Sequence, residues 1–144
     1  MDVVIRIAIL FTAFFICAVA NASGENEPSI NPGTKVYFLS PTDGETVTNP
    51  VVVRFGLSGM GVAPAGVAKD NTGHHHLLID LKTLPDMTKP IPNDKNHRHF
   101  GGGQTEVVLE LAPGEHRLQL LLGDYAHTPH NPPVVSEQIK ILVK

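Results

Sequence analysis

The chain has 144 residues, a formal net charge of −3 at pH 7 and eight histidines. This length predicts a single domain that can bury a core of its own. The charged residues are scattered and form no basic patch, so nucleic acid is excluded as an expected partner.

The chain begins with the three parts of a secretory signal peptide. Residues 1–6 carry a basic side chain, Ile7–Ala20 is uncharged and almost wholly apolar, and Ala20-Asn21-Ala22 has the small residues that signal peptidase accepts. The apolar run is shorter than the about 20 residues of a transmembrane helix. We therefore predict cleavage after Ala22, a periplasmic or secreted location, and no attachment to the membrane afterwards. A retained anchor is the alternative.

The one cysteine, Cys17, lies inside this apolar run. Phe14-Phe15-Ile16 precedes it and lacks the small residues of a lipoprotein signal, which favours soluble export over lipid anchoring. After cleavage the chain has no cysteine, so we expect neither a disulfide nor a thiolate ligand.

Residues 23–34 are polar and contain two prolines, which predicts a flexible tail. Short runs rich in Val, Leu and Ile follow, separated by turn residues, as is typical of strands. The predicted strands are Lys35–Ser40, Val51–Leu57, His75–Leu81, Thr105–Leu111, His116–Leu122 and Glu137–Val143. A further short strand is expected in the proline-rich connection 82–103.

Two of these runs alternate between apolar and polar residues. Val107 and Leu109 share one face of their strand and Glu106 the other, and His116–Leu122 alternates in the same way. A period of two indicates half-buried strands. We predict an all-β fold, an immunoglobulin-like antiparallel β-sandwich of about seven short strands, as a single domain over residues 35–144. A small barrel is the alternative.

The histidines are the most informative feature of the sequence. They are His74, His75, His76, His97, His99, His116, His127 and His130. All except His116 fall at predicted strand ends or in loops. In immunoglobulin order, the loops that carry these seven gather at one end of the sandwich. His116 begins a strand and is expected at the opposite end.

Neutral imidazole is the commonest side-chain ligand for metals. On a strand, His74 and His76 point to one side and His75 to the other, and His97 and His99 have the same spacing. We predict a metal site formed by four ligands: His74, His76, His99 and His127. The secondary candidates are His75, His97, His130 and Asp124, the last as a carboxylate that orients an imidazole.

Gly101-Gly102-Gly103 lies beside these candidates. No predicted helix follows it to supply N–H donors to a phosphate. We expect these glycines to let the backbone turn tightly beside the histidines.

The expected metal follows from the donors. Only Met60 and Met87 remain after cleavage, which disfavours a methionine-rich Cu(I) carrier. Divalent affinity peaks at copper, and copper outside the cytoplasm is mostly Cu(II). We expect Cu(II) first and Zn(II) second.

Two other classes of function stay open. A metal-dependent hydrolase needs only an open coordination position, although no His-Glu-x-x-His or Gly-x-Ser-x-Gly motif is present, so an enzyme is not favoured. An envelope interaction or adhesion module would bind another envelope protein and no metal.

Three segments of the sequence resemble those of a known family. They are Thr72-Gly73-His74-His75-His76-Leu77-Leu78-Ile79-Asp80, His99-Phe100-Gly101-Gly102-Gly103-Gln104-Thr105-Glu106, and Pro113-Gly114-Glu115-His116 with Gly123-Asp124-Tyr125-Ala126-His127. From Val36 onward the chain resembles a family of small exported bacterial domains described only as a domain of unknown function. The resemblance implies bacterial export and a compact β domain, and it implies no activity. Copper-resistance periplasmic carriers have such a sandwich with histidines at one end, which is an analogy of fold.

Overall fold

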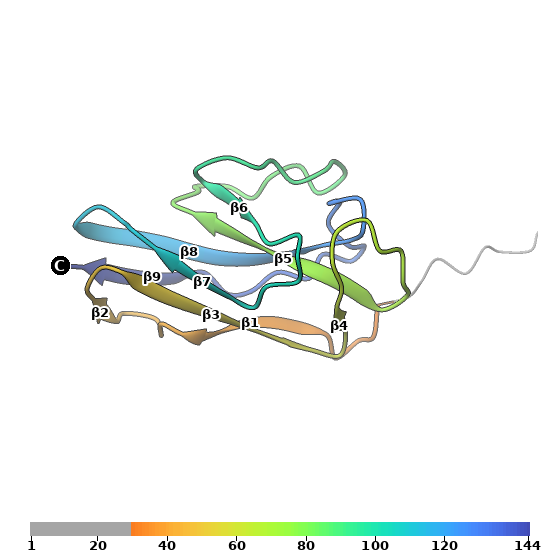
Figure 1. Cartoon of the computed structure of the whole chain (residues 1–144), viewed down its shortest axis with the longest axis horizontal. Coiled ribbons are helices and arrows are strands. Elements are labelled where there is room, and N and C mark those ends of the chain that lie inside the picture. Colours follow the sequence, from red (N-terminus) through yellow and green to blue (C-terminus); the bar gives the residue numbers. More distant parts are fainter. Residues whose placement is uncertain (1–29) are drawn as a thin grey trace, which may run out of the picture.

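The computed structural model describes residues 30–144. The predicted signal peptide, residues 1–22, and residues 23–29 of the predicted tail lie outside this part. Residues 30–144 form an all-β sandwich of two facing sheets (Figure 1), which confirms the predicted fold class. No helix among these residues is long and apolar enough to cross a membrane.

The first sheet has three antiparallel strands in the order β1 (Lys35–Ser40), β3 (Val51–Ser58) and β7 (Glu106–Leu109). Along β3 the side chains of Val51, Val53 and Phe55 are buried while Arg54 is exposed. This alternation turns the apolar face of the sheet toward the second sheet.

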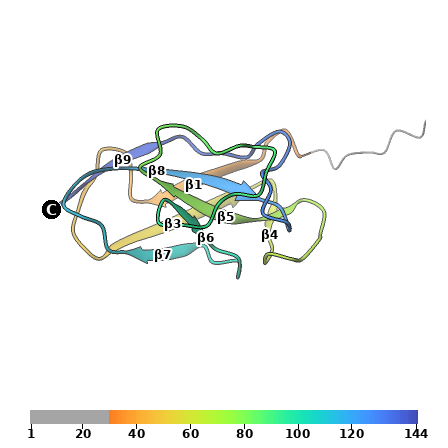
Figure 2. The same cartoon turned by 90° about the horizontal axis from the view of Figure 1, so that it is seen from above.

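The second sheet packs across this face. Its strands, in spatial order, are β2 (Thr46–Val47), β9 (Ile139–Val143), β8 (Gly114–Gly123), β5 (Thr72–Ile79) and β4 (Gly61–Val62), with β6 (His97–His99) also paired to β5. The strands β1, β3 and β7 therefore face β9, β8, β5 and β6, which is the immunoglobulin arrangement. Figure 2 shows the two layers from above.

β5 is buried on both of its faces. Leu77 and Ile79 belong to the main core between the sheets, whereas Leu78 packs with Leu121 and Ile91 in a second, smaller core. Ile91 lies in the connection between β5 and β6, so this connection covers the outer face of the second sheet. His74 and His76, at even positions like Leu78, are therefore on the outer face, and His75 is on the inner face.

Several predicted strand boundaries differ from the structure, and the largest difference within the site is at the start of β5. β5 begins at Thr72 instead of His75, because Thr72 and Gly73 pair in parallel with Gly61 and Val62 of β4. These polar and glycine residues have no apolar alternation, so the sequence predicted a loop there. The short strand expected in the 82–103 connection is β6.

The last residues of the predicted tail contact the sandwich. The Thr34 amide donates to the Asn31 carbonyl at 2.9 Å, and Ile30 packs against the main core. All the strands and both cores lie between Ile30 and Lys144. A protein of residues 23–144 therefore contains every described element and is the form used in the experiments below.

His116 lies at the opposite end of β5 from His74, as predicted. Its Nδ1 is 2.8 Å from the Asp80 carboxylate, and its Nε2 is 2.8 Å from the Ala112 carbonyl. Both partners are acceptors, so only the protonated imidazolium donates to both. Burial lowers the pKa of His116, but the bonds to Ala112 and Asp80 outweigh burial and raise this pKa above its usual value of 6.5.

We expect this pair to give a small loss of stability at alkaline pH. Because the pKa of His116 is higher in the folded chain than in the unfolded one, its contribution is complete below pH 6.5 and is lost as the pH rises through the raised pKa. The loss is about 0.5 kcal/mol, the scale of a partly exposed ion pair. Urea unfolding from pH 6 to pH 9 measures it, with Asp80→Asn as the matched variant. This variant keeps the acceptor for the Arg117 amide, and an unchanged pH dependence in it would contradict the assignment.

Candidate metal centre

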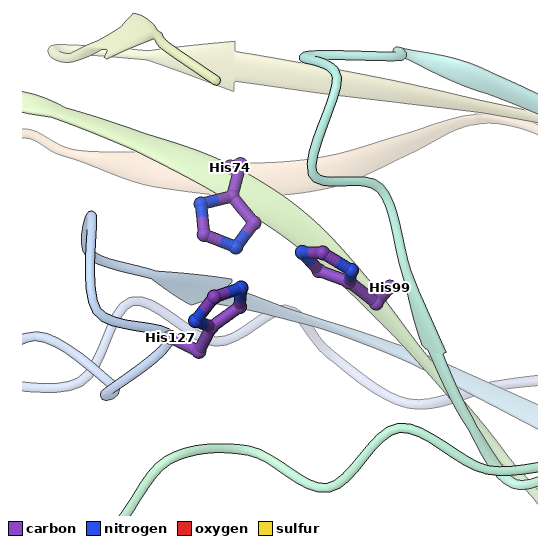
Figure 3. Close-up of side chains that lie close together, drawn as sticks. All are labelled: His74, His99 and His127. Carbon is purple, nitrogen blue, oxygen red and sulfur yellow. The ribbon is translucent and has the colours of Figure 1, made fainter. Parts of the chain in front are cut away.

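Three segments of the chain bring four imidazoles together on the outer face of the second sheet. His74 and His76 come from β5, His99 from the end of β6, and His127 from the loop that follows β8. In the sheet register His76 is directly opposite His99, and His74 is opposite Gly123 at the end of β8. Figure 3 shows three of the rings, those of His74, His99 and His127, turned toward one another.

The four rings lie close together, and three of them offer ring nitrogens close enough to share one ion. Their centroids are 4.7 to 6.2 Å apart in all six pairs. The Nε2 atoms of His74 and His76 are 3.1 Å apart. His74, His99 and His127 each offer a ring nitrogen within 4.8 Å of the others. The structure thus brings together all four residues that the sequence predicted as ligands.

The site is buried on its sheet side and partly open on its loop side. His74 and His76 have no exposed surface, while His99 and His127 are partly buried. Burial, together with repulsion from His99 and His127, lowers the pKa of His74 to about 4. Burial and the neighbouring imidazoles lower the pKa of His76 to about 3. Both rings are therefore neutral at pH 7, the state that binds metals.

The loop after β8 holds His127 in an uncommon backbone conformation. Its φ is 68°, a left-handed value that is uncommon for residues other than glycine. The His127 amide donates to the Asp124 carbonyl at 3.0 Å, and the His127 carbonyl accepts from the Ile91 amide at 2.8 Å. A residue kept in this conformation points to a functional constraint.

Asp124 has a different role from the one predicted. Its Oδ1 accepts hydrogen bonds from the amides of Ala126 and Thr128, at 2.8 and 2.9 Å. These bonds shape the loop that carries His127, and Asp124 makes no hydrogen bond to an imidazole within residues 30–144. Its charge raises the pKa of His74 slightly against the larger effect of burial.

Two glycines leave room for the rings. A Cβ on Gly101 would collide with the ring of His99, and a Cβ on Gly123 would lie 2.9 Å from Nε2 of His76. Gly103 turns the chain with a φ of 83°. The expected turn beside the histidines is confirmed. The sequence did not predict that Gly123 would border the site, because its neighbour in space comes from another strand.

Gly101→Ala is expected to weaken metal binding about tenfold while the domain still folds. The added methyl group displaces the His99 ring, and a misplaced ligand costs affinity on this scale. Isothermal titration with Zn(II) measures the change. Gly33→Ala is the matched control, because its added Cβ meets only Asn31 at 3.8 Å. Equal affinities of the two variants would show that His99 needs no such space.

The secondary candidates do not join the four rings. His75 faces the main core, with its ring centroid 5.2 Å from that of Phe55. His97 Nδ1 lies 2.9 Å from Asp94, and the His130 ring lies beside Gly73. The sequence had suggested that seven histidines meet at one end. The structure brings four together, because side chains alternate along β5 and because the His97 ring is turned to Asp94.

The fold and the site define a class of protein, an immunoglobulin-like sandwich with an imidazole cluster on the outer face of one sheet. The chain belongs to the family described as Domain of unknown function (DUF4399), whose model matches residues 53–144. The match contains all four histidines of the cluster and confirms the predicted resemblance. No curated protein and no solved structure matches the chain.

Proposed function

We propose that this protein is an exported metal-binding module in which His74, His76, His99 and His127 hold one transition-metal ion. The observation that carries the proposal is the convergence of four imidazoles from three segments of the chain. Imidazole is the usual protein ligand for copper and zinc, and the signal sequence directs the module out of the cytoplasm.

The ring nitrogens support the same conclusion. Nδ1 of His74, Nδ1 of His76 and Nε2 of His99 are buried and have no hydrogen-bond partner among residues 30–144. An unpaired buried polar atom costs about 1–3 kcal/mol. The Nε2 atoms of His74 and His76 face each other, and only one of them can donate to the other. A metal ion in this place would take the position of that shared proton and accept a lone pair from each of the two nitrogens.

The donor set suits both Cu(II) and Zn(II). All four donors are imidazole nitrogens, which bind either ion. The described residues contain no cysteine, so thiolate-dependent metals are not favoured. Location outside the cytoplasm is compatible with either ion.

Calorimetric titration of the protein of residues 23–144 with Cu(II) and Zn(II), after treatment with a chelator, tests the proposal. We expect one tight site per chain. His99→Ala and His127→Ala are each expected to weaken binding by at least about 100-fold, because each removes a ligand. His97→Ala is the matched control, since its ring pairs with Asp94 outside the cluster.

The opposite pattern would contradict the proposal. Weak binding of several ions per chain, unchanged in the His99 and His127 variants, would leave the cluster without a role in metal binding. Binding to another protein of the envelope would then be the function that the fold supports.

A further inference from the structure

We infer that the segment of residues 63–66, which carries no ligand, positions the ligands of the metal centre and so controls how tightly the ion is held. The inference rests on the proposed function, because it assumes that the histidine cluster binds a metal ion. It concerns the three imidazoles whose ring nitrogens converge, those of His74, His99 and His127.

Three backbone amides of this segment each donate to a carbonyl close to one of these ligands. The three hydrogen bonds run from Ala63 to Gly73 at 2.9 Å, from Ala65 to Gly101 at 2.8 Å and from Gly66 to Tyr125 at 2.9 Å. The acceptors lie one or two residues along the chain from His74, His99 and His127, in that order. One short segment therefore contacts all three parts of the chain that supply the converging ligands.

The bond to Gly101 acts on the ring of His99. Gly101 lies against this ring, because a Cβ added to Gly101 would collide with it. His99 is the last residue of β6, and Gly101 belongs to the turn that follows. The Ala65 amide fixes the Gly101 carbonyl and, through this contact, the place of the ring.

The bond to Tyr125 acts on the loop that carries His127. The His127 amide donates to the Asp124 carbonyl at 3.0 Å, and Tyr125 lies inside the turn that this bond closes. The Gly66 amide holds this turn through the Tyr125 carbonyl. The distance between the two ligands outside β5 thus depends on two adjacent amides, those of Ala65 and Gly66.

The segment itself has a defined geometry. It follows β4, which pairs with β5, and the side chain of Ala63 is buried. The Val67 amide donates to the Pro64 carbonyl at 3.2 Å, and the φ of Gly66 is 81°. A positive φ at the third residue is that of a type II turn, where glycine is preferred. Such a turn gives its amides fixed directions, as a positioning element requires.

Gly66→Ala tests the inference, with Gly44→Ala as the matched control. The two glycines have φ values of 81° and 77°, and a Cβ added at either would meet no atom within 4 Å. Both variants therefore carry the same backbone strain, and each is expected to lower the melting temperature of the metal-free protein of residues 23–144 by about 4 °C. Only Gly66→Ala is expected to weaken Zn(II) binding, by about fivefold, because the strain is relieved when the turn opens. Calorimetric titration measures the affinities.

Ala65→Pro is a second, independent variant, because it removes the amide that donates to Gly101. Proline suits the second position of a type II turn, so we expect the turn to form and the Zn(II) affinity to fall about tenfold. Ala65→Gly keeps the amide and is expected to stay within about twofold of the parent affinity. In a His99→Ala background, Ala65→Pro is expected to have no further effect, since it acts through the His99 ring. A general loss of structure would not depend on His99 in this way.

The outcomes separate the inference from the proposed function. Equal Zn(II) affinities of Gly66→Ala and Gly44→Ala would overturn the positioning role and leave the metal site in place. An effect of Ala65→Pro that persists in full without His99 would do the same, and if this variant does not fold, the comparison of the two glycines decides. Absence of tight binding of Zn(II) and Cu(II) by the parent protein would overturn both the inference and the proposed function.

Discussion

Zn(II) in excess is expected to raise the melting temperature of the protein of residues 23–144 by about 15 °C. An ion that binds only the folded state adds about 4 kcal/mol at a concentration 1,000 times its Kd, and about 4 °C follows from each kcal/mol in a domain of this size. The four proposed ligands lie between residues 74 and 127 and meet only when β5, β6 and the loop after β8 are in place. Scanning calorimetry before and after addition of the metal measures the shift.

The double variant His99→Ala/His127→Ala serves as the control for this shift. It removes the two partly exposed ligands and leaves β5 unaltered, so its melting temperature without metal is expected to stay near that of the parent. Addition of Zn(II) is expected to change it by less than about 2 °C. A rise equal to that of the parent protein would place the stabilising ion elsewhere.

Substitutions at the adjacent residues His74 and His75 are expected to have opposite effects. His75→Leu removes an imidazole that packs against Phe55 and whose two nitrogens make no hydrogen bond within the described part of the chain. Burial lowers the pKa of this ring to about 4, with a smaller opposing effect from the backbone of Gln104. Leucine has a similar volume, so we expect a gain in stability of about 1–2 kcal/mol and no change in metal affinity.

His74→Leu is expected to keep the fold and to weaken Zn(II) binding by at least about 100-fold, since it removes a central ligand. Urea unfolding gives the stability of both variants, and calorimetric titration gives their affinity for Zn(II). If His75→Leu lost the metal and His74→Leu retained it, β5 would present the opposite face to the ion.

Much of this arrangement could be predicted from the sequence, and the reason is the regular geometry of strands. Alternation along the chain placed His74 and His76 on one side and His75 on the other. The immunoglobulin order of strands then brought His99 and His127 to the same end. Both steps use only the alternation of side chains along a strand and the known order of the loops in such a sandwich.

The face that carries the site could not be predicted. The described strand β5 is buried on both sides, so its pattern does not show which side meets the other sheet. The distinction comes from Ile91, in a proline-rich connection with no periodic pattern, which covers the outer face. The partner of His97 was also hidden, because a contact with Asp94 depends on a local turn and not on strand alternation.

The position of His127 on a loop has a consequence for how long a bound ion stays. Three of the proposed ligands belong to hydrogen-bonded strands, whereas His127 is attached through a few local bonds to Asp124 and Ile91. Segments held by few contacts open far more often than the whole domain. The residence time of the proposed ion is therefore expected to depend on this loop. A change in its hydrogen bonds is expected to alter the rate at which the proposed ion leaves, without altering the sandwich beneath the loop.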